Sequence, residues 1–89
     1  MKVIYKFEAD LGRMGELNGV FVTTDDDIKT LVENETYVNF GEALGKHSEV
    51  GFNMKSEMFK RVTDNEDFII LFEEYNLENG YNPFDYLYE

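Results

Sequence analysis

The sequence predicts an α+β fold: a two-layer sandwich in which an antiparallel sheet of four or five strands carries two helices on one face. Several short segments alternate apolar and polar residues, which is the period of half-buried strands. Two other segments place apolar residues at helical spacing behind acid-rich starts. The predicted order is β-β-α-β-β-α, followed by an extended aromatic C-terminal tail. A chain of 89 residues is expected to form a single domain, 1–89.

The N-terminal part of the chain predicts a β-hairpin and a helix. Apolar residues alternate with charged ones in the first strand at Val3, Tyr5, Phe7, Ala9 and Leu11. The glycine-rich segment 12–19 is expected to be an unusually long connection, and residues 20–22 to be the second strand. Thr24 begins a Thr-x-x-Asp pattern that can cap a short helix over Asp25–Glu33.

The second half of the chain predicts further strands and a second helix. Residues 36–40 are β-branched and aromatic, residues 50–54 alternate, and residues 58–62 either continue that strand or form a fifth. Thr63 begins a Thr-x-x-Glu capping box. The helix behind it carries an apolar stripe at Phe68, Leu71, Phe72 and Tyr75. We expect Phe68, Leu71 and Phe72 of this stripe to be buried and the helix to end at Gly80.

The same periodicities predict which residues form the core. They are Val3, Tyr5, Phe7, Val20, Val22, Ile28, Leu31, Val38, Phe40, Phe68, Leu71 and Phe72. The tail adds the aromatic residues Tyr81, Phe84 and Tyr86. These rings are expected to fold back over a core edge, because a free aromatic tail would aggregate. The alternative is that they anchor a partner, since tyrosine is enriched at interface hot spots.

Charge is the most unusual bulk property of the chain. Nineteen acidic residues against eight lysines and arginines give a formal net charge of −11. This surplus favours a protein partner with a basic surface, and it disfavours direct binding to nucleic acid or to anionic membranes. The chain has no cysteine, which excludes disulfides and thiolate metal sites and favours a cytoplasmic location. No signal peptide or membrane-spanning run is evident, and no cofactor or metal is expected.

The only histidine, His47, lies in the segment 45–51. Ser48 is poorly placed to act with it as a nucleophile, because neighbours in an extended segment point to opposite sides. His47 and Glu49 form the His-x-Glu pattern of zinc deaminases, but those enzymes also need paired cysteines. We therefore expect an ordinary loop histidine bonded to a carboxylate, with a ligand contact as the alternative.

Two of the few cationic residues lie in glycine-rich segments. Arg13 belongs to the segment 12–19, and Lys46 precedes His47 and Ser48 in the segment 45–51. Both segments follow odd-numbered strands, so they can emerge at the same sheet edge and form a positive site for an anionic ligand. The simpler interpretation is that the glycines serve two turns and the cations pair with surface acids.

Three classes of function remain open. The first is a non-enzymatic protein that docks on a larger macromolecule as an inhibitor or adaptor, with a nucleic-acid mimic as a subtype. The second is a small-ligand binder that uses the two glycine-rich segments, and the third is a hydrolase that uses His47 and Glu49. In its size, acidity, tyrosine content and lack of cysteine, the chain is similar to orphan proteins of phages and mobile elements. The candidate binding residues are Arg13, Lys46, His47, Ser48, Glu49, Tyr81, Phe84 and Tyr86.

Overall fold

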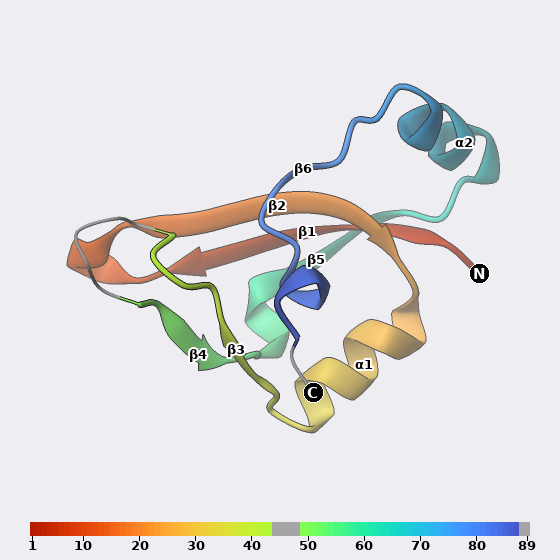
Figure 1. The fold of residues 1–89 in the computed structure, drawn as a ribbon. Coiled ribbons are helices and arrows are strands. Elements are labelled where there is room, and N and C mark those ends of the chain that lie inside the picture. The colour runs from red at the N-terminus through yellow and green to blue at the C-terminus, as the bar shows by residue number, and fades with distance from the viewer. Residues whose placement is uncertain (44–48, 88–89) are drawn as a thin grey trace.

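The computed structural model describes residues 1–43 and 49–87 of the chain. It confirms the α+β class, with an antiparallel four-stranded sheet in the order β5-β1-β2-β6 (Figure 1). The strands of this sheet are β1 (Val3–Asp10), β2 (Glu16–Thr23), β5 (Phe59–Thr63) and β6 (Asn79–Gly80). A separate two-stranded sheet is formed by β3 (Tyr37–Asn39) and β4 (Gly51–Asn53). The helices are α1 (Asp25–Glu33) and α2 (Glu66–Glu74).

The connection between β1 and β2 is much shorter than the sequence suggests. It is a single 3-10 turn, Gly12–Met14, closed by a 2.8 Å hydrogen bond from Leu11 N to Gly15 O. The predicted long loop over 12–19 is therefore wrong for residues 16–19, which belong to β2. The strand continues through this region because Leu17 is fully buried in the core, whereas the residues on either side of it are exposed.

Helix α1 has the predicted bounds and the predicted cap. The Thr24 Oγ1 atom accepts a 3.0 Å hydrogen bond from the backbone N–H of Asp27. Ile28 and Leu31 are one turn apart, and they pack against the sheet face that carries Val3 and Phe7. This face holds the main core of the protein.

The C-terminal tail completes the main core. Residues Pro83–Tyr86 form a 3-10 turn, so the tail is partly coiled where the sequence predicts an extended segment. Pro83 is fully buried, and the Tyr86 ring lies 4.9 Å from the Phe40 ring, measured between centroids. Phe84 approaches Phe21 edge-on, with ring centroids 6.3 Å apart. The expectation that the tail folds over a core edge is confirmed.

Helix α2 lies on the opposite face of the sheet from α1 (Figure 1). The expectation that both helices share one face is therefore wrong. Ile4, the residue that interrupts the alternation in β1, points to this second face and is buried against Ile69 and Phe72 of α2. Val20 and Val22 pack against the same small cluster and are only partly buried, because their register with β1 places them on this face.

The ends of α2 also differ from the prediction. Thr63 is still part of β5, and the cap is Asn65, whose Oδ1 atom accepts a 2.9 Å hydrogen bond from Phe68 N. The helix stops at Glu74, and Asn76 supplies the left-handed backbone conformation with φ of 56°. Gly80 is consequently free to join β6, where it pairs with Gly19.

Candidate protein-interaction surface

Several apolar side chains on α2 and at its C-terminal cap face solvent, and three of them lie on one side of the helix. Phe68, Leu71 and Tyr75 have exposed fractions of 48%, 49% and 68%. We call these three residues the α2 stripe. They share one periodic pattern with Phe72; of that pattern Phe68, Leu71 and Phe72 are predicted to be buried, and only Phe72 lies in the interior. The predicted burial of Phe68 and Leu71 is thus wrong.

The small size of the second sheet face explains this exposure. It offers α2 one apolar patch, formed by Ile4 with parts of Val20 and Val22. That patch accommodates Ile69 and Phe72, whereas residues 68–72 are apolar without interruption and surround the helix. A helix that is apolar all round is normally covered on all sides. This uninterrupted run is the sequence signal that could have revealed an uncovered face.

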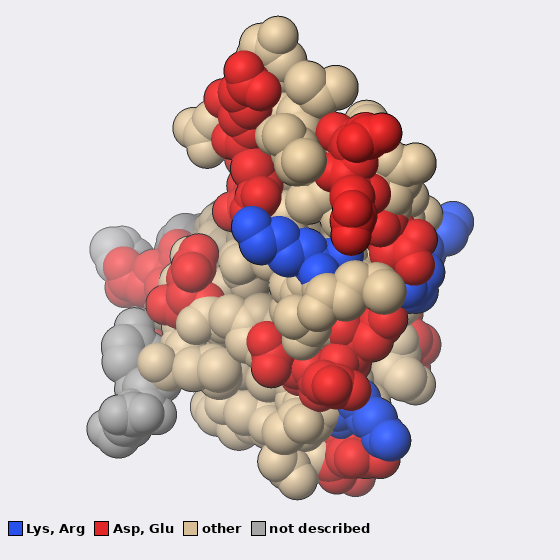
Figure 2. Space-filling model, turned by 90° about the vertical axis from the view of Figure 1, so that its right-hand side faces the viewer, with Lys and Arg blue, Asp and Glu red and all other residues tan. Residues whose placement is uncertain are grey.

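Two unpaired acids lie beside the α2 stripe. At 100° per residue, Asp67 and Glu74 project from the side of α2 directed away from the sheet. Within the described part of the chain, their side chains form no hydrogen bond or ion pair. Figure 2 views the side on which α2 projects, and acidic atoms form two columns there with non-charged atoms between them. Apolar contact area and negative charge are therefore combined on α2.

Two other acids near α2 are already bound within the protein. Glu73 forms an ion pair with Lys2, at 2.9 Å between Oε1 and Nζ. The Oε2 atom of Glu78 accepts a 3.0 Å hydrogen bond from the backbone N–H of Val22. These contacts link the C-terminal end of α2 to Lys2, next to β1, and link the segment after α2 to β2, so Glu73 and Glu78 serve the fold.

An open hollow adjoins α2 on the side away from the stripe. It has a volume of ≈ 420 Å³, and it is lined by Met1, Lys2, Glu66, Ile69, Ile70 and Glu73. Met1 and Ile70 are both largely exposed beside it. The exposed apolar side chains around α2 therefore include Met1 and Ile70 in addition to the α2 stripe.

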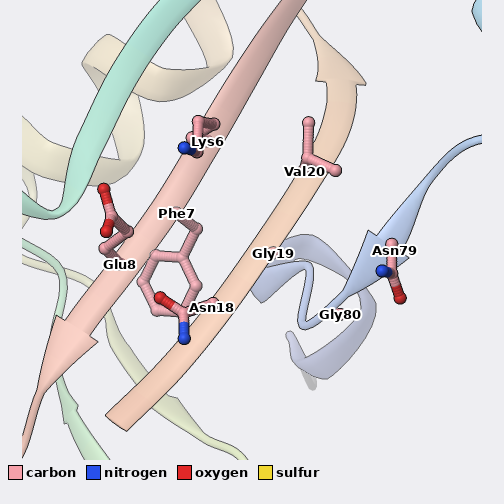
Figure 3. Close-up of a pocket in the computed structure, with 8 residues that line it drawn as sticks. All are labelled: Lys6, Phe7, Glu8, Asn18, Gly19, Val20, Asn79 and Gly80. Carbon is pink, nitrogen blue, oxygen red and sulfur yellow. The ribbon is translucent and has the colours of Figure 1, made fainter.

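The rest of the second sheet face forms a smaller hollow of ≈ 240 Å³ (Figure 3). Lys6 and Glu8 project from β1, Asn18 and Val20 from β2, and Asn79 from β6. Figure 3 shows these side chains spread along the strands. Ligand sites usually combine a deep pocket with polar groups that converge, and this hollow has neither property.

A polar network joins β1, α1 and β5 on the other side of the molecule. The guanidinium of Arg61 donates to both carboxylate oxygens of Asp25 at 3.0–3.3 Å and to Asp64 at 3.1 Å. The Tyr5 hydroxyl donates to Asp25 Oδ1 at 2.7 Å. Hydrogen bonds from Arg61, and then from Tyr5, lower the pKa of Asp25. Burial and the Asp25 hydrogen bond raise the pKa of Tyr5. Each of these groups has a partner inside the protein, which is the arrangement of a structural link.

The sequence-predicted site residues fall into three groups. Arg13 is exposed on the turn between β1 and β2. Lys46, His47 and Ser48 lie outside the described residues, so the proposed meeting of the two glycine-rich segments stays a prediction. Glu49 Oε1 accepts a 3.0 Å hydrogen bond from Asn39 Nδ2.

The aromatic candidates of the tail are used inside the protein. Tyr81, Phe84 and Tyr86 all pack against the main core. The Tyr81 hydroxyl also donates to the carbonyl of Ala43 at 3.2 Å. Their role as partner anchors stays a prediction, whereas their role in the core is visible in these contacts.

Comparison with protein-family models, curated proteins and solved structures found no significant match to this chain. Among the described residues, no helix is long and apolar enough to cross a membrane. The same residues contain no group of three or more histidine, aspartate or glutamate side chains that could hold a metal ion. The function therefore has to be inferred from the physical features of the described surface.

Proposed function

We propose that this protein is a non-enzymatic binding module that docks on a larger protein through α2, as an inhibitor or adaptor. The observation that carries the proposal is the exposed α2 stripe with Asp67 and Glu74 beside it. Contiguous exposed apolar residues rimmed by polar ones mark interaction sites, because leaving them in water is costly unless a partner covers them.

The charge around the α2 stripe indicates what kind of partner it takes. Asp67 and Glu74 favour a surface that carries lysine or arginine next to apolar side chains. A second copy of this chain is disfavoured, because a two-fold contact between stripes would bring the same carboxylates together. Nucleic-acid phosphates and anionic lipids are disfavoured by the net charge of −11.

Capture of the partner from native cell lysate tests the proposal when two matched leucine variants are compared. Leu71 in the stripe and Leu87 in the tail have exposed fractions of 49% and 41%. Leu71→Ser is expected to reduce retention of the partner at least about tenfold, as for truncation of a hot-spot residue. Leu87→Ser is expected to retain it as the wild type does. Equal retention of the partner by both variants would show that α2 is not part of the binding surface.

A further inference from the structure

Two rows of side chains and one further apolar residue lie on the outward side of α2. At 100° per residue, the first row is the α2 stripe. The second row consists of Asp67 and Glu74, and the further residue is Ile70, which borders the hollow of ≈ 420 Å³ near Met1. The acids therefore lie between two apolar regions. A complementary segment needs cations along its centre and apolar side chains on both flanks.

The spacing of the two acids selects the conformation of that segment. Asp67 and Glu74 are seven residues apart, which is about 10.5 Å along a helix axis with a rotation of only about 20°. In a partner helix, cations seven positions apart repeat at the same distance on the same side. In a strand, residues on one side repeat at about 6.8 or 13.5 Å, and neither distance matches.

From this match we infer that the partner segment on α2 is an amphipathic helix with two Lys or Arg residues seven positions apart, flanked on both sides by apolar residues. The inference rests on the proposed function and specifies the partner of the same surface. Because Asp67 and Glu74 lack partners within the described chain, cations from the incoming helix would not displace an existing ion pair. One apolar flank covers the α2 stripe, and the other contacts Ile70 at the rim of the hollow.

Three synthetic peptides of identical composition and length test this inference. In the first, two lysines are seven positions apart between leucine flanks on one helical face. The second is equally helical, but its lysines lie on the face opposite the leucines. The third alternates leucine and polar residues so that it favours a strand. Each is titrated into the full chain at low and high salt, and backbone amide shifts in NMR spectra map the contact.

We expect the first peptide to bind at least about tenfold more tightly than the other two. The largest amide shifts that this peptide causes should lie in α2, including the part around Ile70. The double variant Asp67→Asn/Glu74→Gln should weaken this peptide at least about tenfold at low salt. The control Glu33→Gln/Glu57→Gln removes the same number of exposed charges elsewhere and should change the affinity less than about threefold.

Several outcomes would contradict the inference that the partner segment is a helix. They are tighter or equal binding of the strand-forming peptide, shifts mapped outside α2, and equal effects of the two charge variants. If Leu71→Ser abolishes capture of the cellular partner while the first peptide fails to bind, the inference about a helix falls and docking through α2 stands. If Leu71→Ser captures the partner as the wild type does, the proposed function itself falls.

Discussion

Ile69 and Leu71, two residues apart in α2, have opposite environments. The exposed fraction is 3% for Ile69 and 49% for Leu71. Ile69 contacts Ile4 in the second cluster, whereas Leu71 belongs to the α2 stripe and faces water. Under the proposed function, stability and binding depend on different side chains of one short helix, and single substitutions are expected to separate them.

Truncation of these two residues should have unequal effects on stability. Ile69→Ala should lower the free energy of unfolding by about 2–5 kcal/mol, because it leaves a cavity between α2 and the sheet. Leu71→Ala should lower it by less than about 1 kcal/mol, although the sequence pattern alone predicts the larger value for Leu71. Urea unfolding followed by circular dichroism measures both. Similar losses for the two variants would show that α2 is oriented differently.

Gly80 combines a left-handed backbone with a close approach of another strand. Its φ is +78°, and a Cβ atom there would overlap the backbone carbonyl of Asn18. Gly12 has a similar φ of +65° but no atom within 4 Å of the equivalent position. Comparison of substitutions at Gly80 and Gly12 therefore separates the energetic cost of backbone strain from the cost of steric overlap.

Alanine at Gly80 should be more destabilising than alanine at Gly12. Both variants lose about 1–2 kcal/mol from left-handed strain. Gly80→Ala should lose about 1–3 kcal/mol more, because the Asn18 backbone must move and the β2–β6 pairing is disturbed. Thermal unfolding of the two variants gives the difference. A Gly80→Ala variant as stable as Gly12→Ala would indicate that β6 is not held against β2.

Among the elements, β5 is a sheet edge that is poorly suited to pairing with another strand. Arg61 pairs with Tyr5 and Thr63 with Ile4, so the intervening Val62 forms a bulge without an opposite residue. Lys60 and Arg61 place charges along the same edge. Bulges and charged side chains discourage edge-to-edge association. Strand addition at β5 is thus disfavoured, which supports α2 as the docking element.

The Asp25 link between α1 and β5 predicts a dependence of stability on pH. The pKa of Asp25 is lowered in the folded state, chiefly by Arg61. Its stabilising contribution is therefore present above the ordinary pKa of 3.8 and is lost as pH falls through the lower folded value. The stability gap between the wild type and Asp25→Asn should be largest at neutral pH and should narrow below about pH 4.

Denaturant unfolding at a series of pH values measures this gap. Asp26→Asn is the matched control, since it removes the same charge from the same helical turn without contacting Arg61. If the gap narrows equally for Asp26→Asn, the pH dependence comes from acids at the helix N-terminus in general and not from the contact with Arg61. A gap for Asp25→Asn that stays constant down to pH 2 would contradict the assigned ion pair.

For the whole molecule, the charge of −11 is expected to act mainly on the rate of association with the proposed basic partner. Glu73 has an internal partner and Glu66 lines the hollow, so Asp67 and Glu74, on the outward side of α2, are the acids expected to guide a basic partner. Asp67→Asn/Glu74→Gln should slow association several-fold at low salt and speed dissociation less. The difference in rate should largely vanish near 1 M salt, where charges are screened beyond about 3 Å.

Stopped-flow kinetics with the purified partner checks this expectation over a range of salt concentrations. The Glu33→Gln/Glu57→Gln variant again controls for the loss of net charge alone. If the wild type associates at the same rate at low and high salt, electrostatic guidance is absent, and the acidity of the chain serves only solubility.

The sequence by itself determined the α+β class, strand β1 and helix α1 with its Thr24 cap. These features depend on local information, namely alternation, helical spacing and capping chemistry. It also indicated an acidic chain with a second amphipathic helix, which are two components of the candidate surface. Its proposed loop site rests partly on residues 44–48, outside the described residues, so the structure leaves that prediction open.

Only the tertiary structure decided which apolar residues are covered. The pairing of β2 with β1 extends the hairpin through Leu17. The apolar patch around Ile4 packs against α2, which therefore lies on the face opposite α1. Burial is a property of two surfaces that meet, and a periodic pattern describes only one of them. The stripe of Phe68, Leu71 and Tyr75 has the spacing of a core, but residues 1–43 and 49–87 supply no second surface that covers it.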